Sequence, residues 1–189
     1  MKINQKGRSM VEMLGVLAII GVLSAGGLAG YSKAMFQHKV NETVNTFSQV
    51  LQRFIELKSK DLGEGFEIRN ADDMIKYRLF ENCQKISDYS CKVPLGKLFV
   101  ESYDNSSSIG VFFTSFKECI AFASVHWENA VPIEWWNTHM TELVIEGPGD
   151  RILYNKEANM SNLTIEDITE ACQEQCEEGD CGLTLRLGF

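Results

Sequence analysis

The six cysteines are the residues best equipped for specific chemistry in this chain of 189 residues. Zinc sites are usually built from cysteine pairs two to four residues apart, with further cysteines or histidines completing the four ligands. Here the closest spacings are C-x7-C, C-x3-C and C-x4-C, and no histidine lies nearby. An even number of cysteines in a chain of this size predicts three disulfides formed in an oxidising compartment, and no metal site. The cysteines are Cys83, Cys91, Cys119, Cys172, Cys176 and Cys181.

The pairing of these cysteines is only partly suggested by their positions, because six cysteines allow fifteen connectivities. Cys83 and Cys91 flank a short loop, so we expect this local pair first. Cys119 with one of the three C-terminal cysteines is the next expectation, since that bond would tie a middle helix to the final strand. Cys172 and Cys176 lie four residues apart on one helix face, a geometry too constrained to predict a mutual bond.

A nucleophilic catalytic site is not indicated by the sequence. Ser124, His126 and Glu128 lie close together along the chain, but a catalytic triad is an arrangement in space and not in sequence. Cysteine thiols in an oxidised protein are not available as nucleophiles. We therefore expect a protein that is not an enzyme, with no catalytic residue and no cofactor.

Three further features of the sequence bear on what the protein could bind. Trp127, Trp135 and Trp136 cluster around Pro132 and could hold a glycan or a partner, although anchoring the core or a loop is the favoured interpretation. The acidic stretch 166–180 lacks the D-x-D-x-D-G calcium pattern, so it predicts a solvated face. A net charge of −8, from 18 basic and 26 acidic residues, argues against strong binding to nucleic acid.

The N-terminus carries the most specific pattern. Nineteen residues without a charge, Met13 to Tyr31, would span about 28 Å as a helix, close to the thickness of a bilayer core. Lys2, Lys6 and Arg8 precede this run, and the positive-inside bias therefore leaves the N-terminus in the cytoplasm and exports the rest. Glu12 stands at the start of the run, where a carboxylate costs a few kcal/mol unless a partner relieves it.

The segment Lys6–Leu14, KGRSMVEML, resembles the N-terminus of type IV prepilins and their relatives in secretion systems. In that family a short basic leader ends in glycine, a prepilin peptidase cuts after it, and the fifth mature residue is glutamate. The resemblance covers about residues 1 to 35 and makes Gly7 the last leader residue, Arg8 the first mature and N-methylated residue, and Glu12 the fifth. The chain departs from the family in having Arg8 in place of an apolar first residue, and in lacking the helix-breaking proline midway.

The resemblance implies a structural subunit of a type IV pilus-like filament, which polymerises through its N-terminal helix. Its implied partners are sister subunits, the prepilin peptidase, the inner-membrane assembly platform and, before assembly, membrane lipid. It also implies a single-pass inner-membrane protein whose head is periplasmic and later part of an extracellular pilus or a periplasmic pseudopilus. A pseudopilin of a type II secretion system and a membrane-anchored periplasmic binding module remain alternatives.

The chemistry of Glu12 is independent support for this interpretation. Cutting after Gly7 frees an amine on Arg8. The Glu12 carboxylate of a neighbouring subunit, or of the same subunit, can pair with this amine. Since an unpaired charge in an apolar bundle is costly, such pairing would select one axial register. The adjacent Gly26 and Gly27 could let the helix loosen at the position of the missing proline.

Beyond the apolar run, apolar residues recur at steps of three and four from Met35 to Lys60, which predicts an amphipathic helix ending near Gly63. The chain is thus expected to divide into a leader (1–7), a transmembrane and polymerisation helix (8–31), the amphipathic half of the same helix (32–60) and a head (61–189).

The head is predicted to be α+β, with the long helix laid on an antiparallel sheet of about four strands and stabilised by disulfides. Whether the final strand is central or at an edge stays open. The element order also resembles type IVb-like pilin heads, whereas the seven-residue leader fits the type IVa pattern. Helices are expected at 72–80, 116–127 and 164–175, and strands at 95–103, 109–115, 141–145, 151–154 and 183–189.

Overall fold

The computed structural model describes residues 10–59, 67–103, 106–125, 140–155, 164–177 and 179–188. Contacts divide the chain into two compact units, with the boundary between Lys39 and Val40. Helix α1 (Met10–Ser59) contributes its first part to one unit and its last part to the other. The long helix that the sequence predicts is therefore present, while Lys60 and the expected C-cap Gly63 lie outside the described residues.

The first unit consists, in its described part, of the apolar portion of α1. The large apolar side chains described between Met10 and Tyr31 are all at least 53% exposed. By length and composition this helix could cross a membrane. The helix is continuous through Gly26 and Gly27, so the loosening expected at this pair is not observed.

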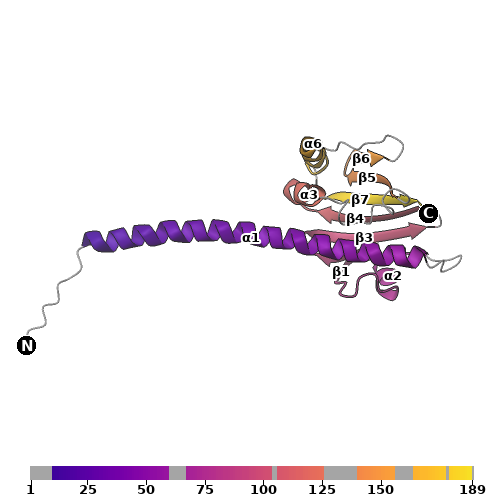
Figure 1. Cartoon of the computed structure of the whole chain (residues 1–189), viewed down its shortest axis with the longest axis horizontal. Coiled ribbons are helices and arrows are strands. Elements are labelled where there is room, and N and C mark those ends of the chain that lie inside the picture. The colour runs from indigo at the N-terminus through magenta and orange to yellow at the C-terminus, as the bar shows by residue number, and fades with distance from the viewer. Residues whose placement is uncertain are drawn as a thin grey trace, which may run out of the picture. The chain divides into compact units, whose positions relative to one another are not determined.

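The second unit is built on one sheet. Among the described residues, seven antiparallel strands follow the order β1-β2-β3-β4-β7-β5-β6 (Figure 1). The expectation of about four strands is therefore too low. The first two strands escaped prediction because they have only three and four residues and no clear alternation. The strands are β1 (Lys85–Ser87), β2 (Ser90–Val93), β3 (Gly96–Tyr103), β4 (Ser106–Phe113), β5 (Met140–Glu146), β6 (Arg151–Asn155) and β7 (Cys181–Gly188).

The final strand, β7, lies in the middle of the sheet. It pairs with β4 from Cys181 to Gly188 on one side, and with β5 from Gly182 to Leu187 on the other. This answers the question that the sequence left open. β7 joins the β1–β4 part of the sheet to the β5–β6 hairpin, because β4 and β5 both pair with it and not with each other.

One face of the sheet forms the core. The register aligns a row of buried aliphatic side chains across four strands, namely Val100, Ile109, Leu185 and Leu143. The last part of α1 supplies Phe47, Leu51 and Phe54, all at most 1% exposed. These side chains lie three and four residues apart, so the amphipathic pattern predicted for this part of α1 is confirmed as a core-forming face.

The three shorter helices are α2 (Ala71–Lys76), α3 (Phe116–Ala123) and α6 (Ile165–Gln175). Side chains of Asn70, Ser115 and Thr164 cap their N-termini by accepting from backbone N–H groups. Three expectations need correction. The helix expected at 116–127 ends at Ala123, with Ser124 as its C-cap. The helix expected at 72–80 stops at Lys76, since Arg78 adopts a left-handed φ of 53°. Ser115 belongs to the cap of α3 and not to the preceding strand, which ends at Phe113.

Helix α3 meets the last part of α1 over the core. The Phe122 ring of α3 lies 5.6 Å from that of Phe47 and 5.3 Å from that of Phe113, measured between centroids. α3 also lies beside α6, to which it is joined by a disulfide (Figure 1). The architecture is thus the predicted α+β head, with helices on one face of an antiparallel sheet and three disulfides.

Candidate functional site

The exposed apolar part of α1 is the first candidate site. Glu12 is the only charged residue between Met10 and Ser32, and it lies in the first described turn of the helix. A carboxylate in this turn is favoured by the partial positive charge of the helix N-terminus. Gly7 and Arg8, the expected cleavage and methylation positions, lie outside the described residues.

The glycines of this helix face open space. A Cβ added at Gly15, Gly21, Gly26, Gly27 or Gly30 would meet no atom within 4 Å. Nothing described in this chain therefore requires a residue without a side chain at these positions. Small residues on an apolar helix are typical of surfaces where a second helix approaches closely.

All six cysteines form disulfides. Cys83 pairs with Cys91, the local pair that the loop predicts, and Cys119 pairs with Cys172, one of the three C-terminal cysteines. The reason given for the second pair is wrong, however, because this bond joins α3 to α6 and not to the final strand. The remaining bond, Cys176–Cys181, connects the end of α6 to β7.

The second and third disulfides lie against each other. The sulfurs of Cys119, Cys176 and Cys181 are all within 4.8 Å of one another, the only such group of potential metal ligands among the described residues. Since each of these sulfurs is bonded to another sulfur, none is present as the thiolate that a zinc ion requires. The cluster is therefore a pair of neighbouring crosslinks.

The other face of the sheet carries charged and aromatic side chains in register. The register aligns three rows across β3, β4, β7 and β5: Lys97, Phe112, Gly182 and Glu146; Phe99, Gly110, Thr184 and Val144; and Glu101, Ser108, Arg186 and Glu142. We refer to this surface as the outer face. The alternation of β3 is a sequence signal that could have revealed it, because Lys97, Phe99 and Glu101 alternate with the buried Leu98 and Val100.

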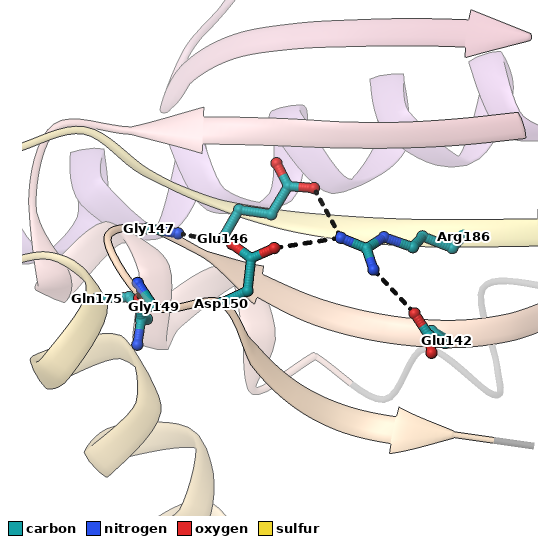
Figure 2. A network of polar contacts seen from close by, with 7 residues as sticks. All are labelled: Glu142, Glu146, Gly147, Gly149, Asp150, Gln175 and Arg186. Atoms are coloured by element: carbon teal, nitrogen blue, oxygen red, sulfur yellow. Dashed lines mark hydrogen bonds and ion pairs between the residues drawn. The ribbon is translucent and has the colours of Figure 1, made fainter.

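An ion-pair network occupies one end of the outer face. The guanidinium of Arg186 lies between Glu142 on one side and Glu146 with Asp150 on the other (Figure 2). Arg186 Nη1 donates to Glu142 Oε2 at 2.9 Å, whereas Nη2 is 3.3 Å from Asp150 Oδ2 and 3.9 Å from Glu146 Oε1. One cation thus serves three carboxylates, and Glu146 has the longest of the three contacts.

The pKa of Glu146 is consistent with a negative charge that Arg186 neutralises only in part. Burial raises it above the ordinary value for glutamate, and the nearby carboxylates of Asp150 and Glu101 raise it further. Thr184 and Arg186 act in the opposite direction. The Thr184 hydroxyl is fully buried and has no hydrogen-bond partner among the described residues. Glu146 is therefore a carboxylate whose charged form would be stabilised by a further cation.

Several expected candidates are accounted for or lie outside the described residues. Ser124 caps the C-terminus of α3 and donates from Oγ to the Ile120 carbonyl oxygen at 2.6 Å, which is a structural role. His126 and Glu128 lie outside the described residues, as do Trp127, Trp135 and Trp136.

The acidic stretch 166–180 contains most of α6. Asp167 forms a capping box with Thr164, and these hydrogen bonds lower the pKa of Asp167. Glu170 and Glu174 form exposed ion pairs with Arg151 of β6, at 3.7 and 2.9 Å. These side chains have structural partners, as expected for a solvated acidic face and not for a calcium loop.

Comparison with known proteins adds no family assignment. No protein-family model matches the chain, and a search of curated proteins finds no match.

Proposed function

We propose that the chain is a structural subunit of a type IV pilus-like filament, made as a prepilin that is cut after Gly7. The observation that carries the proposal is the first part of α1, where apolar side chains on all sides of the helix are exposed between Met13 and Tyr31. A helix that is apolar all round needs a lipid or protein environment. The prepilin-like sequence KGRSMVEML, whose last five residues belong to α1, favours an environment that changes from membrane to filament.

In this proposal, α1 anchors the subunit in the inner membrane with its N-terminus in the cytoplasm, and the head is periplasmic. A prepilin peptidase removes residues 1–7, and the assembly platform transfers the subunit into a filament of sister subunits. The exposed glycines of α1 would then be positions where neighbouring helices approach closely. A pseudopilin of a type II secretion system would use the same parts.

Glu12 would fix the position of each subunit along the filament. Its carboxylate would pair with the Arg8 amine freed by cleavage in a neighbouring subunit. An amine without this partner would cost several kcal/mol in an apolar bundle. Assembly would therefore favour the axial position of the subunits at which the pair forms.

The test is Glu12→Leu, with Glu56→Leu as the matched control at an exposed position of the same helix. We expect Glu12→Leu to be inserted and cleaved normally but to be largely missing from sheared surface filaments. Glu12→Lys should assemble still less well, since it places two positive groups together. Glu56→Leu should assemble. Wild-type amounts of Glu12→Leu in sheared fractions would exclude the pairing role, and a chain that keeps residues 1–7 would favour a membrane-anchored binding module.

A further inference from the structure

A groove of about 410 Å³ lies on the outer face, over β2, β3, β4 and the end of β5. Its lining includes the aromatic side chains Tyr89, Phe99 and Phe112 and the carboxylates of Glu101 and Glu146. We call it the sheet groove. It belongs entirely to the second unit and takes no part in the assembly role proposed for α1.

The floor of the sheet groove is aromatic. The rings of Phe99 and Phe112 are stacked, with centroids 5.0 Å apart and an angle of 24° between their planes. Each ring covers a glycine of the neighbouring strand, since a Cβ at Gly110 or Gly182 would come within 2.5 or 2.7 Å of ring carbons of Phe99 or Phe112. The rings are thus held close to the sheet and stacked against each other.

The walls of the sheet groove carry an excess of negative charge. Among the described residues of its lining, Lys97 is the only cation, and it already pairs with Asp180 at 2.7 Å. Glu101 has no cation within ion-pair distance among the described residues, and its charge raises the pKa of Glu146. Arg186, the nearest cation to Glu146, is shared with Glu142 and Asp150. The described lining of the groove thus carries three carboxylates, those of Glu101, Glu146 and Asp180, and one cation.

We propose that the sheet groove binds an arginine side chain of a partner protein, with the guanidinium stacked on Phe112 and hydrogen-bonded to the carboxylates of Glu101 and Glu146. A guanidinium is the group that combines a planar face for an aromatic ring with N–H donors for carboxylates. The guanidinium would supply a positive charge beside the carboxylates of Glu101 and Glu146.

A bare metal ion fits this site less well than a guanidinium. Divalent cations need several oxygen ligands converging on one point. No three carboxylate groups among the described residues bring their oxygens within 4.8 Å of one another. A groove lined by both aromatic rings and carboxylates instead matches a side chain that has an apolar stem and a charged end.

The test uses the full chain in detergent micelles and a short acetylated peptide, Gly-Arg-Gly amide, followed by NMR titration. The matched peptide carries citrulline, which has the shape of arginine without its charge. We expect the citrulline peptide to bind at least about tenfold more weakly, since its uncharged side chain cannot form charge-assisted hydrogen bonds to the carboxylates.

Substitutions in the protein distinguish binding at the sheet groove from nonspecific electrostatic binding to an acidic surface. Glu101→Gln and Glu146→Gln should each weaken arginine binding by about five- to tenfold, and Phe112→Leu by about threefold through loss of the cation–π contact. Glu166→Gln makes the same charge change at an exposed position of α6 and should change binding less than about twofold.

Equal binding of the citrulline peptide would overturn the proposal. So would a loss with Glu166→Gln as large as with Glu101→Gln, or unchanged binding in both Glu101→Gln and Glu146→Gln. Filament assembly is not measured in any of these experiments, so their failure would leave the proposed function standing.

Discussion

Phe99 occupies the space that a side chain at Gly110, its cross-strand partner, would need. The two residues face each other on β3 and β4, and a Cβ at Gly110 would lie 2.5 Å from Phe99 Cε1 and 2.6 Å from Thr184 Oγ1. The aromatic surface of the outer face therefore depends on a glycine in the middle of a strand, a position where glycine otherwise weakens a sheet.

Gly110→Ala should destabilise the second unit by about 1–3 kcal/mol, because the Phe99 ring and the Thr184 hydroxyl must both move to admit a methyl group. Urea denaturation followed by near-ultraviolet circular dichroism would measure the loss. Gly149→Ala is the control, since a Cβ there meets its nearest atom at 3.7 Å. Adding Phe99→Leu should recover part of the loss, and additive effects of the two changes would contradict the steric explanation.

Glu146→Gln should stabilise the second unit near pH 7. Burial raises the folded-state pKa of Glu146, so the carboxyl group favours folding at low pH and loses this contribution as pH rises through the folded pKa. Because glutamine does not ionise, the Glu146→Gln variant does not lose stability in this way as the pH rises. Denaturation midpoints should therefore be higher for the variant near pH 7 and converge with those of the wild type below the ordinary pKa of glutamate. Glu142→Gln, which removes the 2.9 Å ion pair with Arg186, should give no such gain.

The two disulfides of α6 should differ in their contribution to stability. The cysteines of the Cys119–Cys172 bond are 53 residues apart and those of Cys176–Cys181 only 5. On loop-closure entropy, replacing each pair by serine should cost about 4 and about 2 kcal/mol respectively. Guanidinium denaturation of the two double variants would test the order. A larger loss from the shorter loop would show that loop entropy does not control the difference.

A single Cys172→Ser substitution should produce a different bond. It leaves a thiol on Cys119 within 4.8 Å of both sulfurs of Cys176–Cys181. The Cys119 thiolate can attack either sulfur, forming one new disulfide and releasing the other cysteine as a thiol. Peptide mapping after alkylation should find Cys119 bonded and a free thiol at Cys176 or Cys181. Alkylation of Cys119 alone would mean that the exchange does not occur.

Gly7→Leu should leave an uncut precursor in the membrane, because the prepilin resemblance implies a narrow peptidase subsite for a residue without a side chain. Mass spectrometry of the membrane fraction would show a chain that retains residues 1–7. A chain beginning at Arg8 in this variant would count strongly against the prepilin interpretation. Lys2→Gln, which changes the leader without touching the cut site, should still be processed.

The sequence predicted those elements whose pattern is local. The periodicity of α1, the start of α6 at Thr164 and the short Cys83–Cys91 loop all depend on residues close in the chain. The central place of β7 and the partner of Cys176 depend on contacts between distant segments, which periodicity does not specify. The sheet groove was missed for the same reason. Its lining comes from β2, β3, β4, β5 and Asp180, which only the register brings together.

The central position of β7 has a consequence for how the head is made. A chain emerges from the ribosome or a translocation channel N-terminus first, so β7 is the last strand of the sheet to become available. Until then β4 and β5 each present an open edge, and neither can pair with the other in the native order. Such edges invite pairing with other chains. Until Cys181–Gly188 is available, the growing head therefore carries two unpaired strand edges at which it can associate with other chains.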